Sequence, residues 1–204
     1  DKVGVYFPYG MVAPYPKQHG AHNPCPQIGR RAQAIIRIAA MEQALAQFLE
    51  SLESRTPTWL DDYDLPALRQ LEGEDREKAR TRLIEKLAEL DPRAPRALAD
   101  MGAQTAVADL RKQLKAGSGR FQVEIALALR QLEGFGGAAE CITGILKAPQ
   151  ATDRQTAAHV LSLFQGEAVE TALFEALTKD PDREVRTNAA ISLMLIQDIM
   201  TSPV

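Results

Sequence analysis

Apolar side chains recur every three to four residues along most of the chain, which places them on one face of an α-helix. The first such stripe begins near Gly29 and predicts a helix of roughly 24 residues. Its members are Ile35, Ile38, Met41, Leu45, Phe48 or Leu49, and Leu52. The strict alternation of apolar and polar residues that predicts a β-strand occurs nowhere. The pattern therefore predicts an all-α fold.

Shorter helices follow. Two are predicted between residues 56 and 73, each started by a capping side chain, Thr56 or Asp64, with a proline close behind it. They carry the apolar pairs Trp59 with Leu60 and Leu68 with Leu71. A longer helix is predicted at about residues 75–90. This helix is predicted to bury four side chains: Ala79, Leu83, Leu87 and Leu90.

Residues 1–30 have a different composition, with five of the twelve prolines and three of the four tyrosines. Proline at this density opposes helix and paired strand, so we predict an irregular N-terminal arm. The arm is also too apolar for a segment that stays solvated. We expect it to lie against a surface of this chain or of a partner, through Tyr6, Phe7, Tyr9 and Tyr15.

The second half of the chain repeats a pattern with a period of about 32 residues. Four pairs of a smaller residue followed by leucine mark the period: Ala97-Leu98, Ala128-Leu129, Val160-Leu161 and Ser192-Leu193. Apolar residues keep step 12 positions after the first three leucines, at Leu110, Cys141 and Leu173, and 16 positions after them, at Leu114, Ile145 and Leu177. Each unit is predicted to be two helices that bury their apolar stripes only against a neighbouring unit.

The segment "ALFEALTKDPDREVRTNAAISLMLI", residues 172–196, resembles a HEAT-like repeat of the short, phycobilisome-lyase type. The resemblance rests on Leu173, Leu177, the Asp180-Pro181-Asp182 turn, Val185, Arg186, Ala189, Ala190 and Leu193. It covers about residues 94–197, and the copies of the repeat before residue 172 are weaker. It implies a HEAT-like helical-hairpin solenoid in which N-terminal helices at 31–91 continue into a repeat region at 92–204. Three glycines in "GFGGAAE" and Pro95 depart from the pattern.

Proteins of this family are most often scaffolds, adaptors, inhibitors or immunity proteins, so the resemblance implies a binding role. In such a stack the second helices of the units form one face. The polar residues predicted on that face are Gln104, Asp109, Lys112, Glu140, Thr143, Lys147, Glu167, Glu170, Thr171 and Glu175. Among them we expect a protein partner to contact Lys112, Glu140, Lys147, Glu170 and Glu175.

Charge and hydropathy argue against a nucleic-acid-binding module and against a membrane-inserted protein. The net charge is −3, with 12 basic and 13 acidic residues up to residue 90 and 12 basic and 14 acidic residues after it, so neither half is a basic nucleic-acid module. The sequence has no run of about 18 apolar residues, the length that would predict insertion into a membrane. A nucleic-acid-binding protein similar to the HEAT-like alkylpurine DNA glycosylases, and a metal or pigment-cofactor assembly factor, are the alternatives.

His19, His22 and Cys25 are spaced three residues apart and carry ligand atoms that zinc or copper accepts. Cys141, His159 or a water could supply a fourth ligand. The spacing is not that of a zinc finger, and we interpret these residues as part of a polar loop without metal or other cofactor. Whether Cys25 pairs with Cys141 is open. A cytoplasmic location is favoured, with a mature exported, periplasmic chain as the alternative.

Catalytic chemistry is not indicated. Asp61, Asp62 and Asp64 could bind calcium, but they lack the glycine and terminal glutamate of a calcium loop and are better explained as helix caps. His159 lies inside a predicted helix without a serine or cysteine nucleophile placed to use it. The sequence therefore predicts a non-catalytic protein-binding module.

Overall fold

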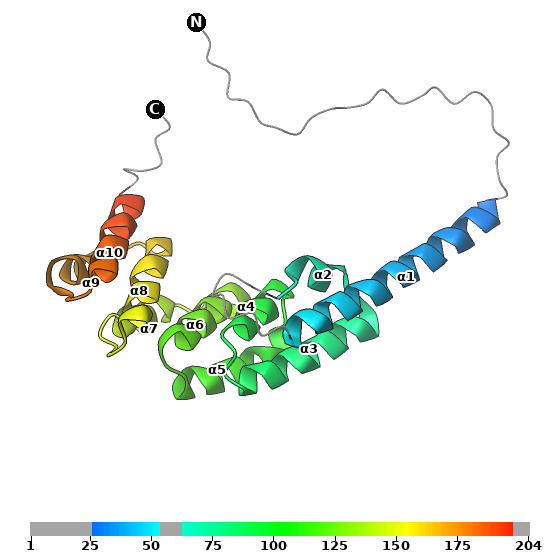
Figure 1. Ribbon diagram of the computed structural model, residues 1–204, viewed down its shortest axis with the longest axis horizontal. Helices are drawn as coiled ribbons and strands as arrows, with labels where there is room; N and C mark the ends of the chain where they lie inside the picture. The colour runs from blue at the N-terminus through cyan, green and yellow to red at the C-terminus, as the bar shows by residue number, and fades with distance from the viewer. Residues whose placement is uncertain (1–25, 54–62, 198–204) are drawn as a thin grey trace, which may run out of the picture. The chain divides into compact units, whose positions relative to one another are not determined.

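The computed structural model describes residues 26–53 and 63–197, with side chains at 33, 35 and 37 and from residue 39 onward. These residues form ten α-helices and two short 3₁₀ turns, and none of them is in a strand (Figure 1). The predicted all-α class is confirmed for this part of the chain. By its internal contacts the chain divides into two units, residues 1–39 and 40–204. The arrangement given below is that of the second unit.

The first helix, α1, spans Pro26–Glu53. The prediction that residues 26–30 are irregular is wrong, because proline is compatible with the first turn of a helix, where its missing N–H has no partner to lose. Phe48 and Leu52 are buried as the stripe predicts, whereas Met41 and Leu45 are partly buried and Ile35 is 66% exposed. Ala44, which the stripe leaves out, is buried as well. Periodicity shows which residues share a face, not whether another helix covers that face.

The next two helices are α2 (Leu65–Gln70) and α3 (Gly73–Ala88). Asp64 caps α2, as predicted: its carboxylate accepts the Ala67 N–H at 2.9 Å. The α3 residues Ala79, Leu83 and Leu87 are buried. Leu90, predicted to face inward, is 51% exposed, because α3 ends at Ala88 and Leu90 turns the chain with a φ of 63°. The helix predicted to carry Trp59 and Leu60 lies outside the described residues.

Seven further helices complete the fold: α4 (Arg93–Asp100), α5 (Val107–Ala116), α6 (Gly119–Glu133), α7 (Ala138–Ile145), α8 (Ala151–Val160), α9 (Glu167–Lys179) and α10 (Arg183–Ile196). Every second helix contacts the next in order, α4 with α6, α6 with α8, and α8 with α10. Of the intervening helices, α5 packs against α6 and α3, and α9 packs against α10. Helix α7 packs against α6 and α8 and also contacts α9.

Directional hydrogen bonds join α6 to α4 and α10 to α8. The Gln131 amide on α6 donates to the Ala99 carbonyl on α4 at 3.0 Å. On α10, Asn188 donates to the Gln155 carbonyl at 3.2 Å, and the fully buried Ser192 hydroxyl donates to the Ala158 carbonyl at 2.7 Å. Each of these bonds therefore fixes the position of one helix along its neighbour.

Two hydrophobic clusters make up the core, and both use α6. The first extends from Ala44 to Leu132 and includes Ile125 and Leu129 of α6. The second extends from Val123 to Ala189 and takes Val123 and Ala126 from α6. Because α6 has buried side chains on two faces, it connects the packing of the two clusters.

Candidate functional site

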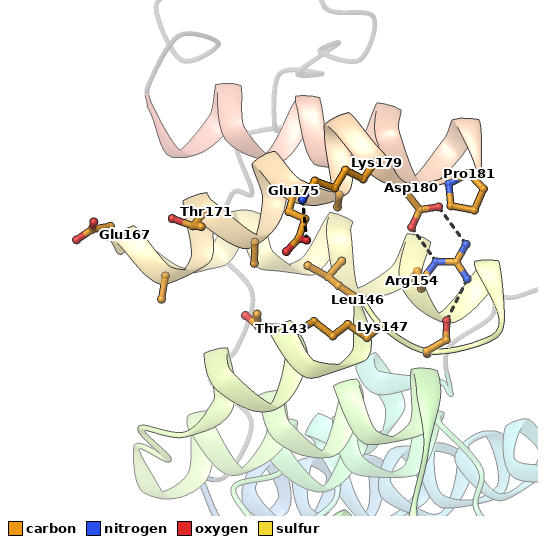
Figure 2. Close-up of a pocket in the computed structure, with 14 residues that line it drawn as sticks. Thr143, Leu146, Lys147, Arg154, Glu167, Thr171, Glu175, Lys179, Asp180 and Pro181 are labelled. Atoms are coloured by element: carbon orange, nitrogen blue, oxygen red, sulfur yellow. Dashed lines mark hydrogen bonds and ion pairs between the residues drawn. The ribbon is translucent and has the colours of Figure 1, made fainter.

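A groove of about 840 Å³ lies between α7 and α9 (Figure 2). One wall comes from α7 and the residues after it, with Thr143, Leu146 and Lys147. The other wall is α9, from Glu167 to Lys179, and Asp180 with Pro181 follows at the end of that helix. A groove of this size holds a peptide segment or a small molecule.

Small apolar side chains form the floor of the groove. Ala168, Ala172 and Ala176 are four residues apart on α9, so they lie on one face of the helix, and Ala148 joins them from the chain after α7. Alanine projects only a methyl group, which lets a bound chain approach the helix closely. The floor therefore favours small apolar side chains in whatever binds there.

An ion pair closes one end of the groove. The Arg154 guanidinium binds the Asp180 carboxylate through two hydrogen bonds, Nε to Oδ2 at 2.8 Å and Nη2 to Oδ1 at 3.0 Å. Its Nη1 donates to the carbonyls of Ala148 and Pro149. The hydrogen bond from Arg154 holds the pKa of Asp180 below its usual range, although burial acts to raise it. The two side chains are only 11% and 6% exposed, so this end of the groove is fixed and its charges are balanced.

Charges along the rim are less well balanced. Glu175 and Lys179 pair at 3.2 Å, but they are 57% and 74% exposed. Lys147 and Glu167 have no ion-pair partner among the described residues, and they lie apart along the groove in Figure 2. The rim thus offers a cation near one end and an anion near the other.

A second groove, of about 660 Å³, lies beside α7 and is lined by Gln122 of α6, by Phe135, and by Glu140, Cys141 and Gly144 of α7. Cys141 is half-buried, and burial together with the charge of Glu140 raises the pKa of its thiol. A raised pKa leaves less of the reactive thiolate, so the structure gives no sign of an activated nucleophile at this cysteine.

The structure brings some of the predicted contact residues together. Lys147 and Glu175 line the α7–α9 groove, and Glu140 lines the second groove. Lys112 is exposed on α5 and Glu170 is half-buried on α9, and neither lines these two grooves. The arm residues Tyr6, Phe7, Tyr9 and Tyr15 lie outside the described residues.

The candidate metal ligands His19, His22 and Cys25 also lie outside the described residues, so the structure does not test them. Within residues 26–53 and 63–197, no three His, Cys, Asp or Glu side chains gather as they would around a metal ion. His159 is exposed on α8.

Sequence reasoning missed two parts of the groove. The Arg154–Asp180 pair spans 26 residues, and no local pattern shows that these two side chains meet. The alanine floor had a visible signal, the four-residue spacing of Ala168, Ala172 and Ala176, which only the packing of α7 and α9 turns into a groove.

The described chain is thus that of an all-α protein with a charged, alanine-floored groove between two helices. No helix in the described ranges is long and apolar enough to cross a membrane. Comparisons with protein-family models, curated proteins and solved structures find no match to this chain.

Proposed function

We propose that this protein is a non-catalytic protein-binding module, of the adaptor, inhibitor or immunity type. In this proposal residues 94–197 are a HEAT-like helical-hairpin solenoid, and a segment of a partner protein binds in the α7–α9 groove. The observation that carries the proposal is the groove itself, with its apolar floor and its charges spaced along the rim.

The order of helix contacts supports the solenoid. Alternate helices from α4 to α10 contact one another in sequence, and the hydrogen bonds between them join residues 32 to 34 positions apart, close to the sequence period. Stacked helical pairs produce this relation because each unit contacts only its neighbours. The second helix of each pair would then be α5, α7 and α9.

The partner segment in this proposal is extended and matches the length of the groove. From Glu167 to Lys179 the wall has 13 residues, which in a helix cover about 20 Å. An extended chain covers that length with about six residues. Lys147 would bind an acidic side chain of the segment, Glu167 a basic one, and small apolar side chains would lie on the alanine floor.

The aromatic N-terminal arm is the second part of the proposal. Tyr6, Phe7, Tyr9 and Tyr15 would supply further partner contacts, since aromatic residues are enriched at protein interfaces. Because α1 begins at Pro26, deletion of residues 1–25 tests the arm without removing helix.

Selection of short random peptides displayed on phage, with the full chain as target, tests the groove. We expect the selected peptides to carry an acidic and a basic residue several positions apart. Lys147→Glu should weaken their binding about tenfold, equivalent to about 1.4 kcal/mol, because it places like charges together. Ala172→Trp should weaken binding further by filling the floor. Affinities are measured by fluorescence anisotropy.

Lys115→Glu is the matched control, since it makes the same charge change at an exposed position on α5, away from the groove. Equal effects of Lys147→Glu and Lys115→Glu would show that the peptides respond to net charge rather than to the groove. Binding of duplex DNA at low salt that depends on Lys147 would overturn the proposal in favour of a nucleic-acid role.

A further inference from the structure

Apolar residues on α9 and α10 are exposed or partly exposed at positions whose counterparts 32 residues earlier, on α7, on α8 and in the turn after α8, are buried. Phe174 on α9 is 61% exposed, whereas Ile142, 32 residues earlier on α7, is fully buried. On α10, Ala190 and Leu193 are partly exposed, whereas Ala158 and Leu161 are fully buried. Likewise, Ile145 and Phe164 are buried, whereas Leu177 and Ile196, 32 residues later, are partly exposed.

We call this surface the end face; it consists of Phe174, Leu177, Ala190, Leu193 and Ile196. The counterparts of these residues 32 positions earlier, on α7, on α8 and in the turn after α8, belong to a cluster that α9 and α10 complete. The end face thus has the apolar character of a surface that already binds two helices within this protein.

A polar feature of the end face repeats as well. Arg186 on α10 donates from Nη1 to the carbonyls of Asp180 and Pro181, just as Arg154 on α8 donates to those of Ala148 and Pro149. The remaining edge of Arg154 binds the Asp180 carboxylate in the turn between α9 and α10. Arg186 has no carboxylate partner among the described residues.

We propose that the end face binds an α-helical hairpin of a partner protein, and that this hairpin carries a carboxylate at its turn, against Arg186. The site is separate from the α7–α9 groove and does not depend on the function proposed for that groove. A hairpin is the occupant that the geometry favours, because the apolar positions lie on two adjacent helices and the arginine lies near the start of α10.

The chain contains a probe with the required chemistry. Its own α9–α10 hairpin has this geometry and carries Asp180 at the turn. A copy of residues 166–197 inserted between Gln197 and Asp198 continues the 32-residue spacing, so that the inserted hairpin can reach the end face of the full chain. We expect the inserted helices to be protected from hydrogen exchange and the melting temperature to rise.

Three substitutions test the contacts. Phe174→Asp in the original α9 should abolish the protection of the inserted helices. Arg186→Gln in the original α10, or Asp180→Asn in the inserted copy, should each reduce it about thirtyfold, as for the loss of a charge-assisted arginine–carboxylate pair like that of Arg154 with Asp180. Combining the two should add little, since both remove the same bond.

Ala168→Asp is the matched control. It places the same charge on α9, at an exposed position that lines the groove instead of the end face, and it should leave the protection unchanged.

Two results would overturn the proposal. One is an inserted hairpin that exchanges at the rate of unfolded chain while the rest of the protein stays protected. The other is a dimer of the unmodified chain, seen by sedimentation and dissociated by Phe174→Asp, which would make the occupant a second copy rather than a partner.

Discussion

Arg154 is held on both sides of its guanidinium group, by two carbonyls of the preceding loop and by the carboxylate of Asp180. Its contacts join the residues after α7 to the turn before α10. A single side chain thus positions two loops and one end of the groove, and its energetic role can be measured through the ionisation of Asp180.

Asp180→Asn should lower the free energy of unfolding at pH 7 by about 2 kcal/mol, because the charge-assisted bonds to Arg154 are lost. The pKa of Asp180 is depressed in the folded state, chiefly by the Arg154 hydrogen bond. Its contribution is therefore complete above the unfolded pKa of about 3.9 and is lost as the pH falls through the folded pKa. Urea unfolding of both proteins from pH 7 to pH 2 should show the difference disappear.

Asp100→Asn is the control, because Asp100 pairs at 2.7 Å with an Arg69 that is 61% exposed. Solvent screens such a pair, so its loss should matter less. A difference between Asp180→Asn and the unmodified chain that persists at pH 2 would contradict the electrostatic explanation.

At the scale of single residues, sequence patterns correctly predicted features that depend only on nearby residues of the same helix. Asp64 was identified as a cap because its partner, Ala67, is three residues away. Leu90 was assigned inward because the 3.6-residue period does not show that the helix stops at Ala88. Lys147 and Glu175 were found as polar positions on second helices, but their common groove depends on contacts between α7 and α9.

Among the helices, the start of α6 depends on one glycine. Gly119 adopts a φ of 57°, and a Cβ there would meet the Asp153 carboxylate, which also accepts the Arg120 N–H at 3.1 Å. The start of α6 is thereby connected to the first turn of α8.

Gly119→Ala should lower the free energy of unfolding by more than about 1 kcal/mol, since it adds backbone strain and displaces Asp153. Gly144→Ala on α7 should instead raise it by up to about 1 kcal/mol, because Gly144 is helical and a Cβ there meets nothing within 4 Å. Thermal and urea unfolding measure both. Similar effects of the two changes would contradict the conformational argument.

Element boundaries were less predictable than element type. The helical period correctly predicted that α1 and α3 are helices. The start of α1 at Pro26 was missed, because the prolines before residue 30 were interpreted as an irregular segment. Proline excludes itself from helix interiors, not from the first turn. The contact of α7 with α9 could be expected only through the repeat, because no local signal specifies packing between helices more than 20 residues apart.

For the molecule as a whole, within residues 40–204, the question is whether its two hydrophobic clusters unfold together. Val123→Ala removes two methyl groups from a fully buried side chain on the α6 face of the second cluster. It should lower the free energy of unfolding by about 2 kcal/mol. If α6 couples the clusters, the slowest-exchanging amides of α3 and α9 should lose protection by the same factor in hydrogen exchange.

Val185→Ala is the comparison, because Val185 is equally buried in the second cluster but lies on α10. It should lower protection in α9 more than in α3. An effect of Val123→Ala confined to α9 would show that the two clusters unfold independently.

The hydrogen bonds from Gln131, Asn188 and Ser192 to carbonyls on the preceding helix of their series have a mechanical consequence. Apolar side chains tolerate small sliding, but a displacement of about 1 Å along the 2.7 Å bond of Ser192 would take it beyond hydrogen-bonding distance. These bonds therefore give the stacked helices shear stiffness. A pulling force would separate α10 from α8 in one abrupt step, rather than stretch their contact gradually.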